Sequence, residues 1–222
     1  MTRDVTLVVT SCGRPDLLNR TLNSFFSFNR YPVQTILIED GSANPPSIEI
    51  PNLTYFANGK RQGQVYSIDR AYQEVKTPYI FHCEDDWEFY KSGFIESSLD
   101  ILEKYSDILQ VWIRAHDDTN GHPLTKLPQF DVQTAVYGYA PEGEIWNGFS
   151  WNPGLRRLSD YQRLGNFSRF QSTDRKSGTT EVNISSAYKN LGLHAAILPD
   201  PEGYVRHIGW GRSLEKIGGG VG

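Results

Sequence analysis

FHCEDDWEF, residues 81–89, is the stretch that decides the expected fold. An apolar run at residues 79–81 leads into it and is typical of the end of a buried strand. Glu84, Asp85 and Asp86 then follow in a row, where such a strand would end. Carboxylates this close raise one another's pKa unless a cation lies between them, and Mg²⁺ or Mn²⁺ takes oxygen ligands together with substrate phosphates. The stretch predicts a metal ion that holds a diphosphate at the carboxyl end of a sheet, where open α/β folds bind ligands. A solvated acidic turn is the alternative.

The residues before this stretch predict strands and helices in alternation. Continuous runs rich in β-branched residues are typical of interior parallel strands. They occur at residues 5–10, 35–38, 53–56 and 79–83. One helix is expected to start at Pro15 and to end before Pro32, and a second spans residues 65–75, because apolar residues recur there every three or four positions. Parallel pairing with right-handed crossovers is the default for this order of elements.

The residues after the acidic stretch give weaker patterns. Helices are expected at residues 95–105 and 155–164, and strands at residues 108–113, 132–139 and 195–198. Residues 119–127 contain Gly and Pro and predict a loop. The polar segment 167–179 is expected to be mobile. Thr180 is expected to cap a last helix that ends at Gly192.

Composition limits the class of protein. With 222 residues, of which 38% are hydrophobic, the chain can bury one sizeable core. A net charge of −4 argues against general nucleic-acid binding, which needs a basic face. Cys12 and Cys83 each end a predicted strand and are expected to be free thiols in a reducing compartment. No apolar run is long enough to cross a bilayer, and no signal peptide is evident, so a cytoplasmic protein is expected.

Three motifs, in this order on predicted strand ends, carry a resemblance to a known family. They are Thr10 at the end of the first strand, Glu39-Asp40-Gly41-Ser42, and Glu84-Asp85-Asp86. Together they resemble the nucleotide-sugar elements of GT-A glycosyltransferases, especially the inverting family 2. The acidic triplet is also similar to the metal motif of N-acetylglucosaminyltransferases of the GnT-I type. The resemblance covers residues 4–105 best and implies a single α/β domain, a GT-A-like, mostly parallel central sheet flanked by helices.

The resemblance implies a set of nucleotide contacts. Asp40 would accept a hydrogen bond from the base, and Thr10 would line the same pocket. Asp69 falls where the family often has an Asn near the nucleotide. Arg61 is a candidate contact to the phosphates. A plain turn at Asp40 and a solvated Arg61 are the structural alternatives.

The resemblance also implies a metal site and a catalytic base. Asp86 would bind Mn²⁺ or Mg²⁺ directly, with His207 completing the shell, and Asp85 would contact the ribose or a metal-bound water. Glu181 aligns with the base that takes the proton of the acceptor. A carboxylate in the first turn of a helix is kept ionised by the helix dipole, which suits a base. Ordinary helix-start charge is the alternative for Glu181, and Asp174 is the alternative base.

Residues 146–154 are unusually rich in aromatic residues and glycine. Trp146 and Trp151, with Phe149 between them, could form a stacking floor for a sugar. They could equally belong to the hydrophobic core, and the sequence leaves both possibilities open.

The resemblance implies a metal-dependent glycosyltransferase. It would move a sugar from a UDP- or GDP-type donor to a hydroxyl of a glycan acceptor, with inversion. Residues 1–105 would form the nucleotide-sugar half and residues 106–217 the acceptor half. Residues 218–222 are rich in glycine and are expected to be a tail or the start of a linker in a longer chain. A sugar-nucleotide pyrophosphorylase and a non-catalytic carbohydrate-binding module on the same scaffold remain alternatives.

Overall fold

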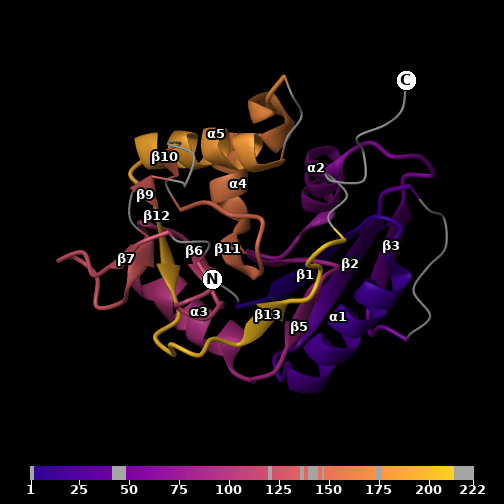
Figure 1. The fold of residues 1–222 in the computed structure, drawn as a ribbon, viewed down its shortest axis with the longest axis horizontal. Coiled ribbons are helices and arrows are strands. Elements are labelled where there is room, and N and C mark those ends of the chain that lie inside the picture. The colour runs from indigo at the N-terminus through magenta and orange to yellow at the C-terminus, as the bar shows by residue number, and fades with distance from the viewer. Residues whose placement is uncertain are drawn as a thin grey trace.

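The computed structural model describes residues 3–41, 49–119, 122–135, 138–139, 145–146, 148–173 and 177–212. A nine-stranded sheet forms its centre (Figure 1). From one edge to the other, its strands are β3 (Leu53–Ala57), β2 (Val33–Glu39), β1 (Val5–Ser11), β4 (Tyr79–Glu84), β11 (Gly154–Arg157), β6 (Ile108–Trp112), β12 (His194–Ile197), β8 (Thr134–Ala135) and β7 (Leu124–Thr125). Only β11 and β8 run against the other strands of this sheet, so the mostly parallel α/β architecture is confirmed.

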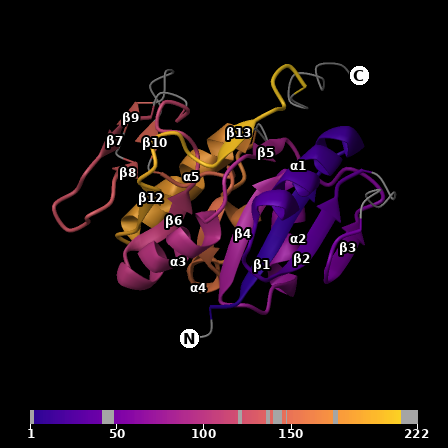
Figure 2. The ribbon, with the colours of Figure 1, turned by 90° about the horizontal axis from the view of Figure 1, so that it is seen from below.

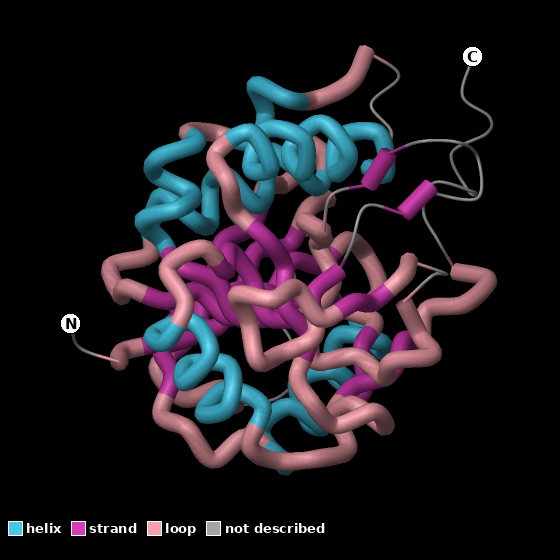
Figure 3. The backbone as a smooth tube through the Cα atoms, turned by 90° about the vertical axis from the view of Figure 1, so that its left-hand side faces the viewer, coloured by secondary structure: helices cyan, strands magenta, loops and turns pink. Residues whose placement is uncertain are grey.

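Helices cover both faces of the sheet (Figure 3). α1 (Pro15–Phe28) and α3 (Phe94–Lys104) pack on one face through apolar residues such as Leu22, Phe25 and Leu99. α2 (Gln64–Glu74), α4 (Leu158–Leu164) and α5 (Ser177–Asn190) pack on the other face, together with the 3₁₀ helix η1 (Phe167–Phe170). None of the described helices has the length and apolar character that a membrane span requires.

The four strands of the N-terminal half confirm the sequence pattern. β3, β2, β1 and β4 lie side by side and are parallel (Figure 2). Every residue of β1 is buried, because helices cover both faces of an interior parallel strand. The backbone N–H of Asp40 donates to the carbonyl of Ser11, so β1 and β2 end at the same edge of the sheet. Residues after these strand ends are thereby brought together.

Strand β11 is the main correction to the expected fold. Residues 155–157 were expected to begin a helix, but residues 154–157 form an antiparallel strand between β4 and β6, and only residues 158–164 are helical. Gly154 lies so close to β6 that a Cβ atom there would be 2.4 Å from the carbonyl oxygen of Val111. This close approach favours glycine at position 154. In the sequence alone, a glycine here indicates only a turn.

Two further short pairings were not expected. β5 (Trp87–Phe89), which follows the acidic triplet, pairs antiparallel with β13 (Val205–His207) near the C-terminus. The expected strand at residues 132–139 is described as two short pieces, β8 and β9 (Gly138–Tyr139), and β9 pairs with β10 (Ile145–Trp146). The expected loop at residues 119–127 includes β7.

The segment 167–179 contains secondary structure that was not expected where it is described. Residues 167–170 form η1, and the ring of Phe167 is fully buried beneath it. Helix α5 begins at Ser177, three residues before the expected cap, so Thr180 is a buried residue of the helix. The alternative base, Asp174, lies outside the described residues.

Candidate active site

A cleft of about 930 Å³ opens at the carboxyl ends of β1, β2 and β4. Its walls also include residues of α5, of β13 and of the loop before α2. Seven of the ten predicted site residues line it: Thr10, Asp40, Arg61, Asp85, Asp86, Glu181 and His207. The cleft lies where ligands bind in open α/β sheets.

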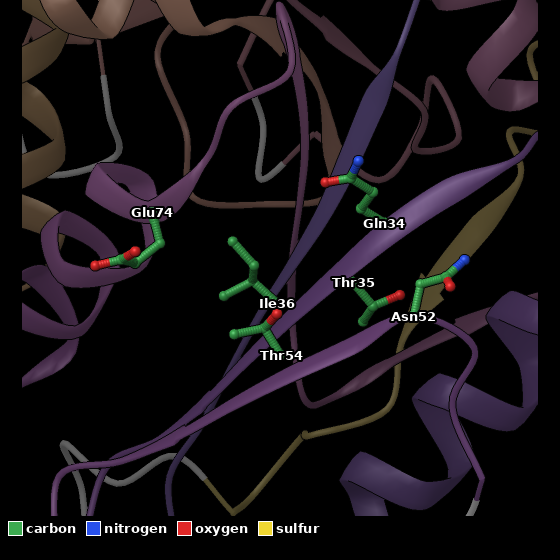
Figure 4. A pocket seen from close by; sticks show the side chains of 6 residues that line it. All are labelled: Gln34, Thr35, Ile36, Asn52, Thr54 and Glu74. Atoms are coloured by element: carbon green, nitrogen blue, oxygen red, sulfur yellow. The ribbon is translucent and has the colours of Figure 1, made fainter.

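A second, smaller cavity of about 440 Å³ lies on β2 and β3, nearer their amino ends (Figure 4). Six residues line it: Gln34, Thr35, Ile36, Asn52, Thr54 and Glu74. Glu74, at the end of α2, is the single titratable group among these residues. A single ionisable group is not the cluster of charged side chains that the larger cleft contains, so the larger cleft is the candidate site.

Arg14 lies between the two aspartates of the acidic triplet. Its Nε donates to Asp85 Oδ2 at 3.2 Å, its Nη2 donates to Asp85 Oδ1, and its Nη1 donates to Asp86 Oδ2 at 2.8 Å. Ser11 Oγ and the backbone N–H of Cys12 also donate to Asp85 Oδ2, at 3.0 and 3.3 Å. A cation was expected between these carboxylates, and in this structure a guanidinium of the chain itself holds that place.

The three carboxyl groups of the acidic triplet have pKa values shifted from their usual range. Burial raises the pKa of Asp85 to about 6, although the contacts with Arg14 oppose the rise. Burial would also raise the pKa of Asp86, but hydrogen bonds from His207 and Arg14 outweigh it and hold that pKa below its usual range. Desolvation, together with the negative charges of Asp86 and Glu181, raises the pKa of Glu84 well above its usual value. Asp86 therefore loses its proton more readily than Asp85 or Glu84.

The pairing of β5 with β13 brings His207 next to Asp86, the last residue of the acidic triplet. His207 is opposite Trp87 in the register, and its Nε2 lies 3.3 Å from Asp86 Oδ2. The backbone N–H of Ile208 donates to the carbonyl of Asp86 at 2.8 Å, which fixes the strand against the turn. At Gly209 a Cβ atom would lie 2.3 Å from Asp86 Oδ2, so the chain passes the carboxylate too closely for any side chain.

Asp86 and His207 fit a divalent metal ion as a pair of ligands. They present an oxygen, Asp86 Oδ2, and a nitrogen, His207 Nε2, that lie 3.3 Å apart. Within the described residues, no three side chains of His, Cys, Asp or Glu are grouped so that they could hold an ion alone. Mg²⁺ and Mn²⁺ commonly take few protein ligands and fill their shell with phosphate oxygens and water. Such an ion would share Asp86 Oδ2 with Arg14.

Asp40 organises the opposite wall of the cleft. Its Oδ1 accepts hydrogen bonds from Asn58 Nδ2 at 2.9 Å and from the backbone N–H of Gln62 at 2.7 Å, and its Oδ2 accepts one from the backbone N–H of Gly63 at 2.8 Å. The loop that carries Arg61 is thereby tied to the end of β2. A carboxylate has about four acceptor positions, so these bonds leave room for a ligand donor.

Glu181 reaches the cleft from α5. Its Oε1 accepts the backbone N–H of Trp151 at 2.6 Å, which fixes the carboxylate toward the loop before β11. Because α5 begins at Ser177, Glu181 is not in the first turn, and the expected support from the helix dipole is corrected. What remains is its position, on the cleft wall and close enough to Glu84 for the two charges to interact.

Two predicted site residues lie outside the cleft and are corrected. Asp69 accepts hydrogen bonds from Tyr161 Oη at 3.0 Å and from the backbone N–H groups of Phe167 and Ser168 at 2.8 and 2.9 Å, so it holds the start of η1 rather than a nucleotide. Trp151 is 2% exposed and belongs to the hydrophobic core, so its ring has no open face for a sugar. The side chain of Trp146 lies outside the described residues.

Sequence reasoning missed Arg14 as a member of the site. The signal was present, because a basic residue in the turn after the first strand is near the end of β4 once β1 and β4 pair. Its partner, however, lies 71 residues along the chain, so only the pairing of the strands reveals the contact.

Comparisons with known proteins agree with this geometry. A family model described as glycosyl transferase family 2 matches residues 6–192. Among solved structures, the chain is similar to the mannosyltransferase PcManGT from Pyrobaculum calidifontis in complex with GDP-Man and Mn²⁺, at 15% identity and a TM-score of 0.61 over 89% of this chain and 55% of that chain. It is also similar to S. aureus TarS residues 1–349 in complex with UDP, at 15% identity and a TM-score of 0.61 over 91% of this chain and 59% of that chain.

At these identities the two structures show the fold, which is GT-A-like as expected. The chain spans less than two thirds of the length of either structure. Among curated proteins, no sequence matches this chain significantly.

Proposed function

This chain belongs to glycosyl transferase family 2, and we propose that it transfers a sugar from a nucleoside-diphosphate donor to a hydroxyl group of a glycan acceptor. The observation that carries this proposal is the cleft in which Asp40, Asp86, Glu181 and His207 line one space at the carboxyl ends of the parallel strands. The family model confirms the expected resemblance to family 2, and it supports a glycosyltransferase rather than a pyrophosphorylase.

The donor would be a UDP- or GDP-sugar. Of the two similar structures, one was solved with GDP-Man and Mn²⁺ and the other with UDP. Asp40 would accept a hydrogen bond from the base, with Thr10 beside it. Arg61 crosses over Gly41, where a Cβ atom would lie 2.9 Å from its Cγ, and would contact the phosphates. Asp85 would contact the ribose or a metal-bound water.

Asp86 and His207 would hold Mn²⁺ or Mg²⁺ against the diphosphate. When bound, the ion would supply positive charge to the diphosphate leaving group. Two backbone contacts fix Asp86 beside His207. The chain at Gly209 passes close to the carboxylate of Asp86, and the N–H of Ile208 donates to the carbonyl of Asp86.

Glu181 would remove the proton of the acceptor hydroxyl. The acceptor oxygen forms a bond to the anomeric carbon while the bond from that carbon to the diphosphate breaks, and the proton goes to the carboxylate of Glu181. The N–H of Trp151 holds one carboxylate oxygen of Glu181 in place. Attack from the face opposite the leaving group inverts the anomeric carbon, and NMR of the product tests this directly. Retention would contradict the role of Glu181.

The donor and metal assignments can be tested together by thermal unfolding. We expect UDP or GDP to raise the melting temperature more with Mn²⁺ than without it, because ligands that bind only the folded state stabilise it by mass action. Asp86→Asn should lose the part that depends on Mn²⁺. Asp100→Asn is the matched control, since Asp100 lies on α3, away from the cleft, and its exposed carboxylate pairs with Arg3.

The outcomes separate the parts of the proposal. An equal shift in Asp86→Asn and in the parent protein would remove Asp86 from the metal site. No shift with any nucleoside diphosphate would contradict the donor proposal. Binding without release of nucleoside diphosphate from any UDP- or GDP-sugar, over a panel of glycan acceptors, would favour the non-catalytic binding module.

A further inference from the structure

The side chain of Arg14 reaches from the start of α1 to the turn after β4. Arg14 stands at the N-cap position, where a guanidinium cannot cap the helix because it has only donors, and its side chain pairs with Asp85 and Asp86 instead. It is 13% exposed and lines the cleft. Its guanidinium contacts both oxygens of Asp85 and one oxygen of Asp86.

This contact set overlaps with the proposed metal site. Nη1 of Arg14 lies 2.8 Å from Asp86 Oδ2, the same oxygen that lies 3.3 Å from Nε2 of His207. A divalent ion and the guanidinium are both cations, and each needs that oxygen. Two cations that close repel one another strongly in a partly buried site. Direct coordination by Asp86 Oδ2 therefore requires Arg14 to move or to find another anion.

We propose that Arg14 is a built-in competitor of the metal ion. In the donor-free protein it occupies the acidic pair and keeps the affinity for free metal low. A metal that enters with a nucleoside diphosphate brings negative charge, which gives the displaced guanidinium a new partner in the same cleft. Metal and diphosphate then bind cooperatively, and each raises the affinity for the other by the same factor. This inference rests on the proposed function.

The test measures binding of Mn²⁺ alone, by electron paramagnetic resonance of the free ion, in the absence of nucleotide. Arg14→Gln should bind Mn²⁺ about tenfold more tightly than the parent protein, or more, because one positive charge next to the ion is gone. Arg3→Gln is the matched control. It removes a positive charge that pairs with Asp100 and Glu103 and lies before the amino end of β1, whereas the cleft is at the carboxyl end, so the affinity of this variant should stay within about twofold of the parent value.

The second measurement repeats the titration with saturating UDP or GDP. The diphosphate should raise the Mn²⁺ affinity of the parent protein by a clearly larger factor than that of Arg14→Gln, because the variant has no competitor to displace. Arg14→Lys keeps the charge with fewer contacts and should lie between the two. It also serves as the test variant if Arg14→Gln does not fold, which circular dichroism would show.

Equal or weaker binding of Mn²⁺ by Arg14→Gln would overturn the inference, since Arg14 would then order the acidic pair rather than compete for it. If the parent protein binds Mn²⁺ with UDP or GDP in that case, the proposed function stands and only the competition fails. If neither protein binds Mn²⁺ under any condition, both the metal assignment and this inference fail.

Discussion

Asp40 and Asp69 are equally buried, at 4% exposure each, and each accepts three hydrogen bonds, yet they belong to different regions. Asp40 belongs to the cleft wall, the set of Thr10, Asp40, Arg61, Asp85, Asp86, Glu181 and His207. Asp69 lies against the aromatic layer, the buried rings of Tyr72, Phe149, Trp151, Tyr161 and Phe167 beneath α2 and α5. Neither burial nor the number of hydrogen bonds distinguishes the two aspartates. They differ in which parts of the chain supply the hydrogen-bond donors.

The donors of Asp40 come from a loop that borders the cleft, whereas those of Asp69 come from η1 and α4, which cover the aromatic layer. Within that layer, the rings of Tyr161 and Phe167 pack with their centroids 4.9 Å apart. A carboxylate in the cleft wall can still accept a hydrogen bond from a ligand. The carboxylate of Asp69, against the aromatic layer, is bonded to α4 and η1 and faces no cleft. Substitutions in the wall should therefore change activity or affinity, and substitutions in the layer should change stability.

The largest effect is expected at Glu181, in the wall. Glu181→Gln should lower turnover by about 10²–10⁴-fold, which corresponds to about 2.7–5.5 kcal/mol of activation free energy, since it removes a general base. Donor affinity and melting temperature should change little. Steady-state kinetics and calorimetry measure both. Normal turnover in this variant, with loss of turnover in Asp174→Asn, would move the base to residue 174.

The next effect is expected at Trp151, in the layer. Trp151→Ala should lower the free energy of unfolding by about 3–5 kcal/mol, because it leaves a cavity where a ring packs 4.8 Å from Phe149 and 5.3 Å from Phe167. Urea unfolding measures this loss. Trp151→Phe is the control and should cost less, because the indole N–H it removes has no partner in the described part of the chain. If the Trp151→Ala protein is stable but no longer binds donor, Trp151 contacts the donor and belongs to the cleft wall.

At Asp69 the cost should be somewhat smaller and confined to stability. Asp69→Ala should destabilise the protein by about 3 kcal/mol, because the buried N–H group of Phe167, the partly buried N–H group of Ser168 and the buried hydroxyl of Tyr161 lose their acceptor. Asp69→Asn, which keeps one acceptor oxygen, should lose less. The affinity of the folded variants for nucleoside diphosphate, measured by calorimetry, should equal that of the parent. A weaker affinity with unchanged stability would show that Asp69 contacts the nucleotide.

The smallest effect is expected at Asp40. Asp40→Ala should weaken nucleoside-diphosphate binding by about 1.5–3 kcal/mol, the usual contribution of a hydrogen bond to a charged group. Binding of inorganic pyrophosphate with Mn²⁺ should barely change, since it has no base. An equal loss for both ligands would mean that Asp40 acts on the phosphates through the loop that carries Arg61.

Local patterns predicted the N-terminal half because its elements are defined by their own residues. Buried parallel strands are continuous apolar runs, and amphipathic helices repeat every three or four residues, so β1, α1, β2, β3, α2 and β4 could be predicted one by one. The motifs at the ends of β1, β2 and β4 then followed, since parallel strands carry their carboxyl ends to one edge of the sheet. Four predicted residues, Thr10, Asp40, Asp85 and Asp86, lie on the cleft for this reason.

The sequence by itself therefore determined the α/β class, the edge of the sheet where the cleft opens and its acidic residues. Only the tertiary structure decided which groups meet there. Strand β11 depends on its neighbours β4 and β6, and Arg14 reaches Asp85 because β1 and β4 pair. Asp69 and Trp151 have the residue types of a binding site, but the packing of η1 and α5 over them buries both. Periodicity records the burial of a residue within its own element, whereas contacts between distant residues depend on which elements pack together.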